Sequence, residues 1–133
     1  MAPYTAGTST RSLWTGRVLS GIAVLFLAVD VAMKLAGAKV AVDGTTQVGF
    51  APHHVLPLGL IGLACLIFYL IPRTAPIGAV LWTGYMGGAV ATHMRLDNPL
   101  FSHTLFPIYV AALLWGGLYL RDERVRGLLR PAR

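Results

Sequence analysis

The chain has 133 residues, of which 56% are hydrophobic and only 12% are charged. A soluble domain carries about a quarter charged residues, so this composition argues against a soluble enzyme and indicates an integral membrane protein of one domain. The formal net charge of +6 arises from basic residues that flank apolar segments, which is typical of membrane topology signals and not of a nucleic-acid-binding protein. The single cysteine, Cys65, excludes an intramolecular disulfide.

The apolar residues fall into four segments. Residues 1–12 are small and polar and are expected to form a disordered tail. Each apolar segment can supply a membrane-spanning helix of about 20 residues, and the four predicted spans cover about 13–36, 54–71, 76–94 and 100–120. The sequence therefore predicts an all-α fold, a four-helix transmembrane bundle over residues 13–121, followed by a basic cytoplasmic tail at 122–133. The first segment is long for a signal peptide and is expected to remain in the protein.

The connection between the first two segments contains a turn signal. Asp43 and Gly44 lie between two short alternating runs, 39–42 and 45–48. This pattern predicts either a β-hairpin or a plain loop, and the residues alone do not separate the two. Pro52 then fits the first turn of the second predicted span.

The basic residues predict the orientation of the spans. Arginines concentrate in the N-terminal flank, in the turn at Arg73 and in the C-terminal tail, whereas the opposite side carries Lys39 and Arg95. Counted over short loops, this bias places both termini in the cytoplasm, in agreement with an even number of spans in the cell membrane.

Titratable side chains recur at one depth of the predicted bundle. Lys34, His54, His93 and His103 each lie 17 to 20 residues from an arginine that marks the cytoplasmic end of the same span. At about 1.5 Å per residue, all four lie roughly 25–30 Å from the inner face. Ionisable groups inside a membrane are costly and therefore mark candidate sites. The candidate ligand-binding residues are Asp30, Lys34, His54, His93, Arg95 and His103; no catalytic residue is assigned.

Asp30 and Lys34 are spaced to share one face of a helix and form an ion pair. The pair then forms either a charged wall of an outward-facing cavity or a simple anchor, with Lys34 reaching the headgroups. Arg95 either binds a ligand, reaches the headgroups or pairs with Asp97. His54 and His103 lie near helix starts and His93 is more embedded.

The sequence offers little for a bound metal or haem. His93 and His103 lie at similar depth, so axial ligation of a haem is geometrically feasible, but no paired ligand spacing or CxxCH attachment motif is present. Haem is therefore the less favoured cofactor and no metal site is predicted.

Small residues suggest where helices pack. Gly84, Gly87, Gly88 and Ala91 form a small-residue face that is expected to pack against a neighbouring helix rather than to contact a ligand. Gly16 with Ser20, and Gly59 with Gly62, offer similar notches on the first two spans.

The stretch "IPRTAPIGAVLWTGYMGGAVATHMR" resembles the signature of the DoxX-like family of small four-span membrane proteins. The matching positions include Pro72, Arg73, Thr74, Gly78, Gly84, Gly87, Gly88, Ala89, Ala91, His93 and Arg95. The start of the first span is similar at Gly16, Arg17, Asp30 and Lys34, and "LRDERVRGLL" is similar near the end.

The resemblance implies an architecture and suggests an activity. Better-known relatives in the wider DoxX group are tied to thiosulfate oxidation that feeds quinone and to membrane oxidoreductase complexes. The leading hypothesis is an accessory membrane component, not an enzyme by itself, that binds a quinone-like molecule or an oxidoreductase partner at its outer polar layer. The alternatives are a non-enzymatic scaffold or assembly factor, and a small-molecule permease acting as a homo-oligomer.

Overall fold

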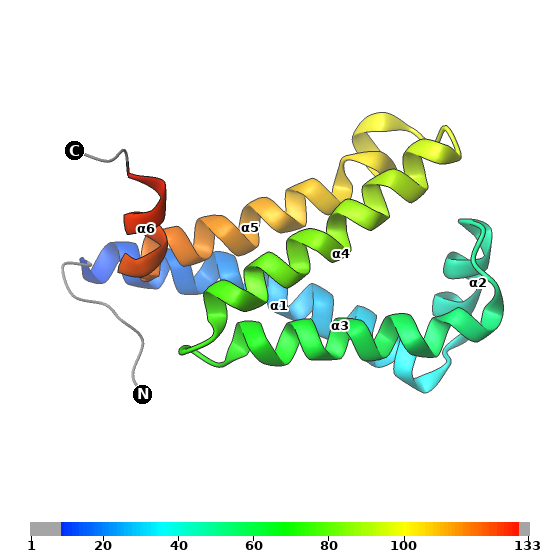
Figure 1. Ribbon diagram of the computed structural model, residues 1–133, viewed down its shortest axis with the longest axis horizontal. Helices are drawn as coiled ribbons and strands as arrows, with labels where there is room; N and C mark the ends of the chain where they lie inside the picture. The colour runs from blue at the N-terminus through cyan, green and yellow to red at the C-terminus, as the bar shows by residue number, and fades with distance from the viewer. Residues whose placement is uncertain (1–8, 131–133) are drawn as a thin grey trace.

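The computed structural model describes residues 9–130, which form helices and no strand (Figure 1). The long helices are α1 (Thr10–Ala36), α3 (Val55–Leu70), α4 (Ala75–Arg95) and α5 (Phe106–Arg121). The short ones are α2 (Lys39–Gln47) and α6 (Glu123–Leu129), with single helical turns at Pro52–His54 and Leu100–Thr104. The all-α prediction is confirmed for the described residues.

The first helix begins earlier than predicted. The backbone N–H of Ser12 donates to Oγ of Ser9 at 3.1 Å, and this N-cap starts α1 at Thr10. The prediction of a disordered tail is therefore wrong for residues 10–12, while residues 1–8 lie outside the described part of the chain. α1 ends at Gly37, whose left-handed backbone (φ 66°) closes the last turn, as is common at helix C-termini.

The segment after α1 is neither a hairpin nor a plain loop. Residues 39–47 form α2, so both sequence-based alternatives are wrong. Ala41, Thr45 and Val48 recur at helical spacing and line one cavity. Packing on that face outweighs the turn preference of Asp43-Gly44, because tertiary contacts override local propensity.

Prolines mark the starts of two helical segments at the end of the molecule that carries α2. Pro52 begins the short turn before α3, as predicted. The fourth apolar segment is interrupted: residues Leu100–Thr104 form a wide turn, and α5 starts at Phe106. Pro107 has no N–H to donate to the preceding turn, which explains the interruption.

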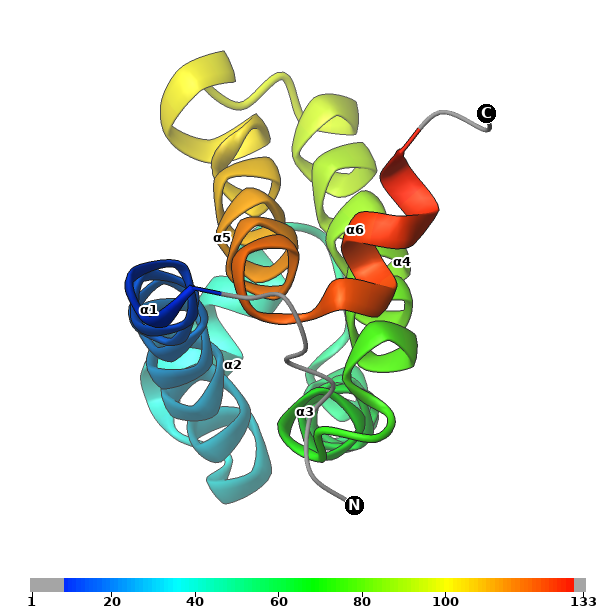
Figure 2. The same ribbon diagram turned by 90° about the vertical axis from the view of Figure 1, so that its left-hand side faces the viewer.

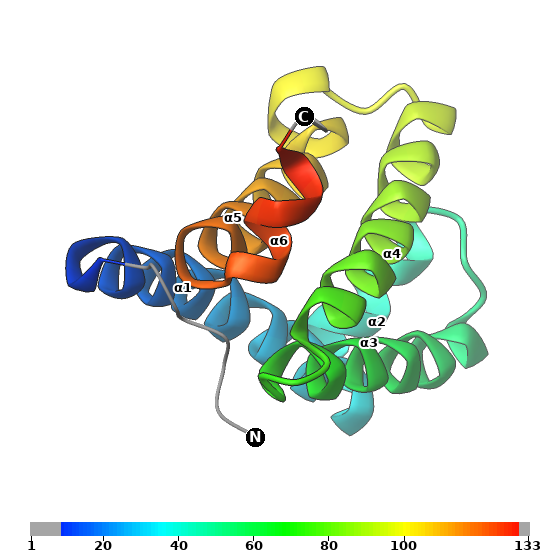
Figure 3. The ribbon, with the colours of Figure 1, turned by 60° about the vertical axis from the view of Figure 1, so that its left-hand side comes forward.

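The long helices converge at the end where α1 begins and α5 ends, which we call the terminal end, and they diverge at the other end. Figure 2, which looks onto the terminal end, shows α1, α3, α4 and α5 around a common core. Figure 3 shows α4 rising away from α3 after their shared turn. The convergence depends on glycine: a Cβ on Gly117 would lie 2.9 Å from the carbonyl oxygen of Gly16, and a Cβ on Gly78 would overlap the backbone of Tyr69.

The outer surface of the bundle is apolar. The core is centred on Leu27, Trp82, Leu114 and Leu118, each at most 2% exposed, whereas long runs of large apolar side chains face outward from α1, α3, α4 and α5. By length and composition, three of the described helical segments can cross a membrane: Thr10–Ala36, Pro52–Leu70 and Leu100–Arg121. The protein thus has the helices of a membrane protein.

The predicted basic tail contains α6, which is held against the bundle. Asp122 is buried and accepts hydrogen bonds from the backbone N–H and the side chain of Arg124. Arg124 also donates to the carbonyl oxygens of Pro72 and Arg73 in the turn between α3 and α4. The hydrogen bonds that Arg124 donates to the Asp122 carboxylate raise the pKa of the Arg124 guanidinium above its usual value. One buried carboxylate therefore joins the C-terminal segment to the middle of the chain.

Candidate functional site

A partly open cavity of about 580 Å³ lies between the diverging ends of the helices. α1 and α3 form one side, α4 the other, and α2 lies at the outer end. Its wall is mostly apolar, with polar side chains at a few points. The lining residues are Asp30, Lys34, Ala41, Gly44, Thr45, Val48, Phe50, Leu58, Ile61, Gly84, Tyr85, Gly88, Ala89, Thr92 and His93.

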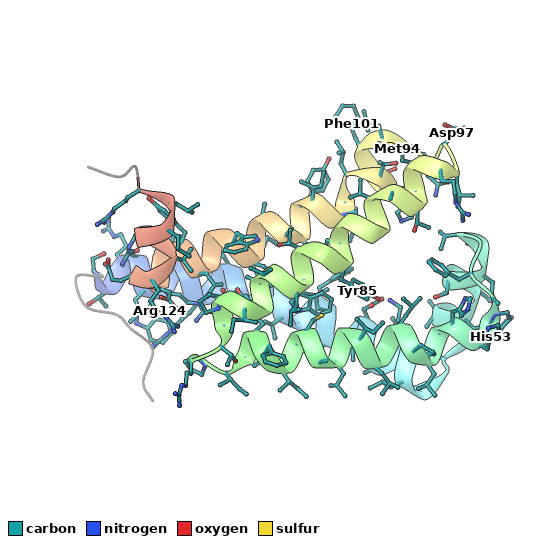
Figure 4. The ribbon with its side chains drawn as sticks, in the orientation of Figure 1. His53, Tyr85, Met94, Asp97, Phe101 and Arg124 are labelled. Carbon is teal, nitrogen blue, oxygen red and sulfur yellow. The ribbon has the colours of Figure 1, made fainter. Side chains whose placement is uncertain are left out.

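The polar centre of the cavity is formed by α1 and α4. Nζ of Lys34 lies 2.5 Å from Oδ2 of Asp30 and 3.2 Å from the hydroxyl oxygen of Tyr85. The side chains of Lys34 and Asp30 are 14% and 32% exposed. Figure 4 shows Tyr85 pointing from α4 into the space above α3. The ion pair predicted from the spacing of Asp30 and Lys34 is confirmed, and both residues line the cavity.

Two donors remain free at this centre. A lysine ammonium has three N–H groups, and Lys34 uses one on Asp30 and one on Tyr85. The hydroxyl of Tyr85 accepts from Lys34, so its own proton stays available. A single carbonyl oxygen in the cavity can accept from both groups, and the ion pair with Asp30 orients the lysine.

His93 supplies a further polar group on the wall of the cavity. Its Nδ1 lies 2.8 Å from Nδ2 of Asn98. Because an amide nitrogen only donates, Nδ1 accepts in the neutral ring and the proton resides on Nε2. His93 therefore offers its Nε2–H as a donor to a bound molecule.

The other sequence-predicted residues lie outside the cavity lining. His54 is exposed and contacts the rings of His53 and Phe50, and Figure 4 places His53 at the far end of α3. The ring of His103 lies 5.9 Å from that of His93, edge to face. Equal depth along a span thus does not place side chains in one site, because the rotation of each helix decides which way they point.

Arg95 connects α4 to the segment that follows α2. Its guanidinium donates to the carbonyl oxygen of Val48 at 3.2 Å and lies against Gly49, whose φ of 96° is reserved largely for glycine. It forms no ion pair with Asp97 among the described residues. Arg95 thus bridges the mouth of the cavity rather than lining it.

The glycines in the second half of α4, unlike Gly78 near its start, do not pack against another of the described helices. A Cβ on Gly84, Gly87 or Gly88 would meet no atom within 4 Å, and Ala91 is exposed. The packing expected there within the bundle is wrong, because α4 has already diverged from its neighbours; Gly84 and Gly88 instead line the cavity. The notches predicted at Gly59 and Gly62 do contact α1.

Tyr85 was not predicted from the sequence, although its hydroxyl accepts a hydrogen bond from Lys34. A helical spacing of seven residues joins Tyr85 to Thr92 and places both on the face that lines the cavity. Counting seven residues back from Thr92, which lies beside His93, would have predicted that Tyr85 shares its helix face. Within residues 9–130 no cluster of three or more His, Cys, Asp or Glu side chains is arranged to hold a metal ion.

Comparison with protein families gives a match to the DoxX-like family over residues 18–117. No curated protein and no solved structure gives a significant match. The matched range begins beside Arg17 and ends in α5, so it includes every residue of the cavity. Because the match covers well over half of the 133 residues, the chain belongs to the DoxX-like family.

Proposed function

We propose that the cavity binds the headgroup of a quinone-like small molecule, and that the protein serves as an accessory component of a membrane redox or detoxification system. The observation that carries this proposal is the pair of free donors, one on Lys34 and one on Tyr85, at the polar centre of a mostly apolar cavity. A planar ring with a carbonyl oxygen matches apolar walls with two convergent donors.

The chemistry of the lining residues favours an accessory role. Their polar side chains, His93 among them, donate or accept hydrogen bonds to a bound molecule. Two-electron reduction of a bound quinone is then assigned to a partner oxidoreductase in the same membrane.

The proposed arrangement in the membrane has four spans with both termini in the cytoplasm. α4 has 21 residues, a length similar to that of the other spans. α4 is less apolar than the three segments that can cross a membrane by length and composition. This difference has a local explanation, since Gly84, Gly88 and Thr92 face the cavity rather than lipid. The arginine bias sets the orientation, and the cavity then opens toward the outer side.

Binding of ubiquinone-1, a short-chain quinone, to protein in nanodiscs tests the proposal. Tyr85→Phe removes one donor without changing shape, which predicts a two- to tenfold loss of affinity, about that of one neutral hydrogen bond. The double variant D30N/K34M removes both charges together, so that no carboxylate is left unpaired, and predicts a loss of about tenfold or more. Isothermal titration calorimetry measures both.

Matched controls separate the cavity from the general surface. Tyr119→Phe changes an exposed tyrosine, and Lys39→Met changes an exposed lysine outside the lining. Both controls are expected to bind within twofold of the wild type. Equal affinity in all variants, or no binding to folded wild-type protein, would refute the quinone site and leave the polar residues with a role in holding the bundle together.

A further inference from the structure

A second, smaller cavity lies at the opposite end of the bundle, where the helices converge. It has a volume of about 220 Å³ and is lined by residues of α1, α3 and α5: Arg17, Ser20, Gly21, Val24, Tyr69, Leu70 and Arg121. Two of these residues are arginines and none is acidic. The cavity therefore concentrates positive charge beside an apolar wall.

Neither arginine has an acidic partner within the described part of the chain. Every ion pair recorded for residues 9–130 involves other basic residues, namely Lys34, Arg124 and Arg126. The guanidinium of Arg17 lies 5.1 Å from the centre of the Trp14 ring. The guanidinium of Arg121 lies 5.6 Å from the centre of the Tyr69 ring. Cation–π contacts leave the N–H edges of a guanidinium free for an anion.

A directed chain of hydrogen bonds holds Arg121 in place. The hydroxyl of Tyr69 uses its only proton on the carbonyl oxygen of Leu114, at 2.8 Å. The hydroxyl of Ser20 therefore donates to Tyr69, also at 2.8 Å, and its oxygen accepts from Nε of Arg121 at 3.2 Å. Ser20 and Tyr69 are buried. The buried pair fixes one edge of the guanidinium and leaves its terminal amino groups for a ligand.

The surroundings of the cavity match a lipid at the membrane interface. Trp14 beside Arg17 is typical of the headgroup region. From this level, exposed Val18, Ile22 and Leu25 extend along α1 toward the middle of the bundle, and exposed Leu70 lies on α3. A phosphate group fits between two arginines, and acyl chains fit the apolar surface that continues from them.

We infer that this cavity binds the phosphate headgroup of an anionic phospholipid from the leaflet at the terminal end of the bundle. Arg17 and Arg121 contact the phosphate, and Gly21, which has open space at its Cβ position, leaves room for the glycerol and the first acyl carbons. The inference is independent of the quinone site, since no residue lines both cavities.

Native mass spectrometry of the purified full chain tests the inference. We expect the wild type to retain one phosphatidylglycerol molecule at a concentration at which it retains no phosphatidylcholine. A basic residue near a membrane surface contributes about fivefold to anionic lipid binding, so Arg17→Gln is expected to weaken retention about fivefold and R17Q/R121Q about 25-fold. Arg17 donates no hydrogen bond within the described residues, so its single variant is expected to keep its fold.

The matched control is R11Q/R73Q, which removes the same charge from exposed arginines at the same end of the bundle. It is expected to bind phosphatidylglycerol within twofold of the wild type. Equal retention of phosphatidylcholine, or an equal loss in the control, would overturn the inference, because binding would then reflect apolar contact or net charge alone. Displacement of the lipid by inorganic phosphate would overturn it too, since the cavity would then be a site for a small anion.

Discussion

Replacing single glycines by alanine distinguishes the close helix contacts from the open ones. A Cβ on Gly117 would overlap Oγ of Ser20 and lie 2.9 Å from the backbone N of Ser20. Such overpacking costs about 1–3 kcal/mol. Displacing Ser20 also breaks its hydrogen bond with Tyr69, about 1 kcal/mol more. Alanine regains about 0.5–1 kcal/mol of helix preference, so Gly117→Ala is expected to lower the free energy of unfolding by about 1–3 kcal/mol.

The same change in α4 is expected to have the opposite sign. The Cβ positions of Gly84 and Gly87 are open, so Gly84→Ala and Gly87→Ala gain the helix preference without a clash and stabilise the protein by up to about 1 kcal/mol. Unfolding titrations in mixed micelles of mild detergent and dodecyl sulfate measure all three variants. If Gly84→Ala or Gly87→Ala cost as much as Gly117→Ala, α4 would be closely packed there and the cavity would not exist as described.

Three further predictions address contacts outside the cavity. Tyr69→Phe leaves the hydroxyl proton of Ser20 without its acceptor and removes the hydrogen bond to the carbonyl oxygen of Leu114. It is expected to cost about 1–3 kcal/mol of unfolding free energy, against none for the exposed Tyr119→Phe in the same titration. Asp122→Ala removes the N-cap of α6 and the partner of Arg124. We expect the free energy of unfolding to fall by about 2 kcal/mol and residues 123–129 to be cleaved faster by a protease. Unchanged proteolysis would contradict the docking of α6. Arg95→Gln is expected to accelerate hydrogen exchange over residues 39–50 while changing the free energy of unfolding by less than about 0.5 kcal/mol. The control is Lys39→Gln, which changes an exposed residue of the same segment. Exchange as slow in Arg95→Gln as in this control would show that Arg95 does not hold the segment.

The sequence was sufficient to predict the features that depend on neighbours along the chain. Apolar length located the long helices to within a few residues, and a spacing of four placed Asp30 beside Lys34. These features follow from helix geometry alone. The segment around Asp43 was mispredicted because its turn preference is local, whereas the packing of Ala41 and Thr45 is not.

The direction in which side chains point could not be predicted from depth. His54 and His93 lie at similar distances along their helices from Arg73, yet of the two only His93 lines the cavity. The rotation of each helix about its axis depends on which residues allow close approach to a neighbour, and in this chain that is decided at the terminal end by Gly16, Gly78 and Gly117. For the same reason the hydroxyl of Tyr69 could not be assigned its partners on α1 and α5.

One physical requirement connects the polar pair of α1 with the glycines of α4. An ion pair such as Asp30 and Lys34 is costly in dry hydrocarbon, and its cost falls where water or a polar ligand can reach it. Large side chains at Gly84 and Gly88 would fill that space, whereas glycine leaves it open. At Gly117 the absent side chain allows two helices to touch, while at Gly84 and Gly88 it leaves room for a third molecule. The lower apolarity of α4 is then a consequence of the cavity it faces, and the same helix remains consistent with a span of the membrane.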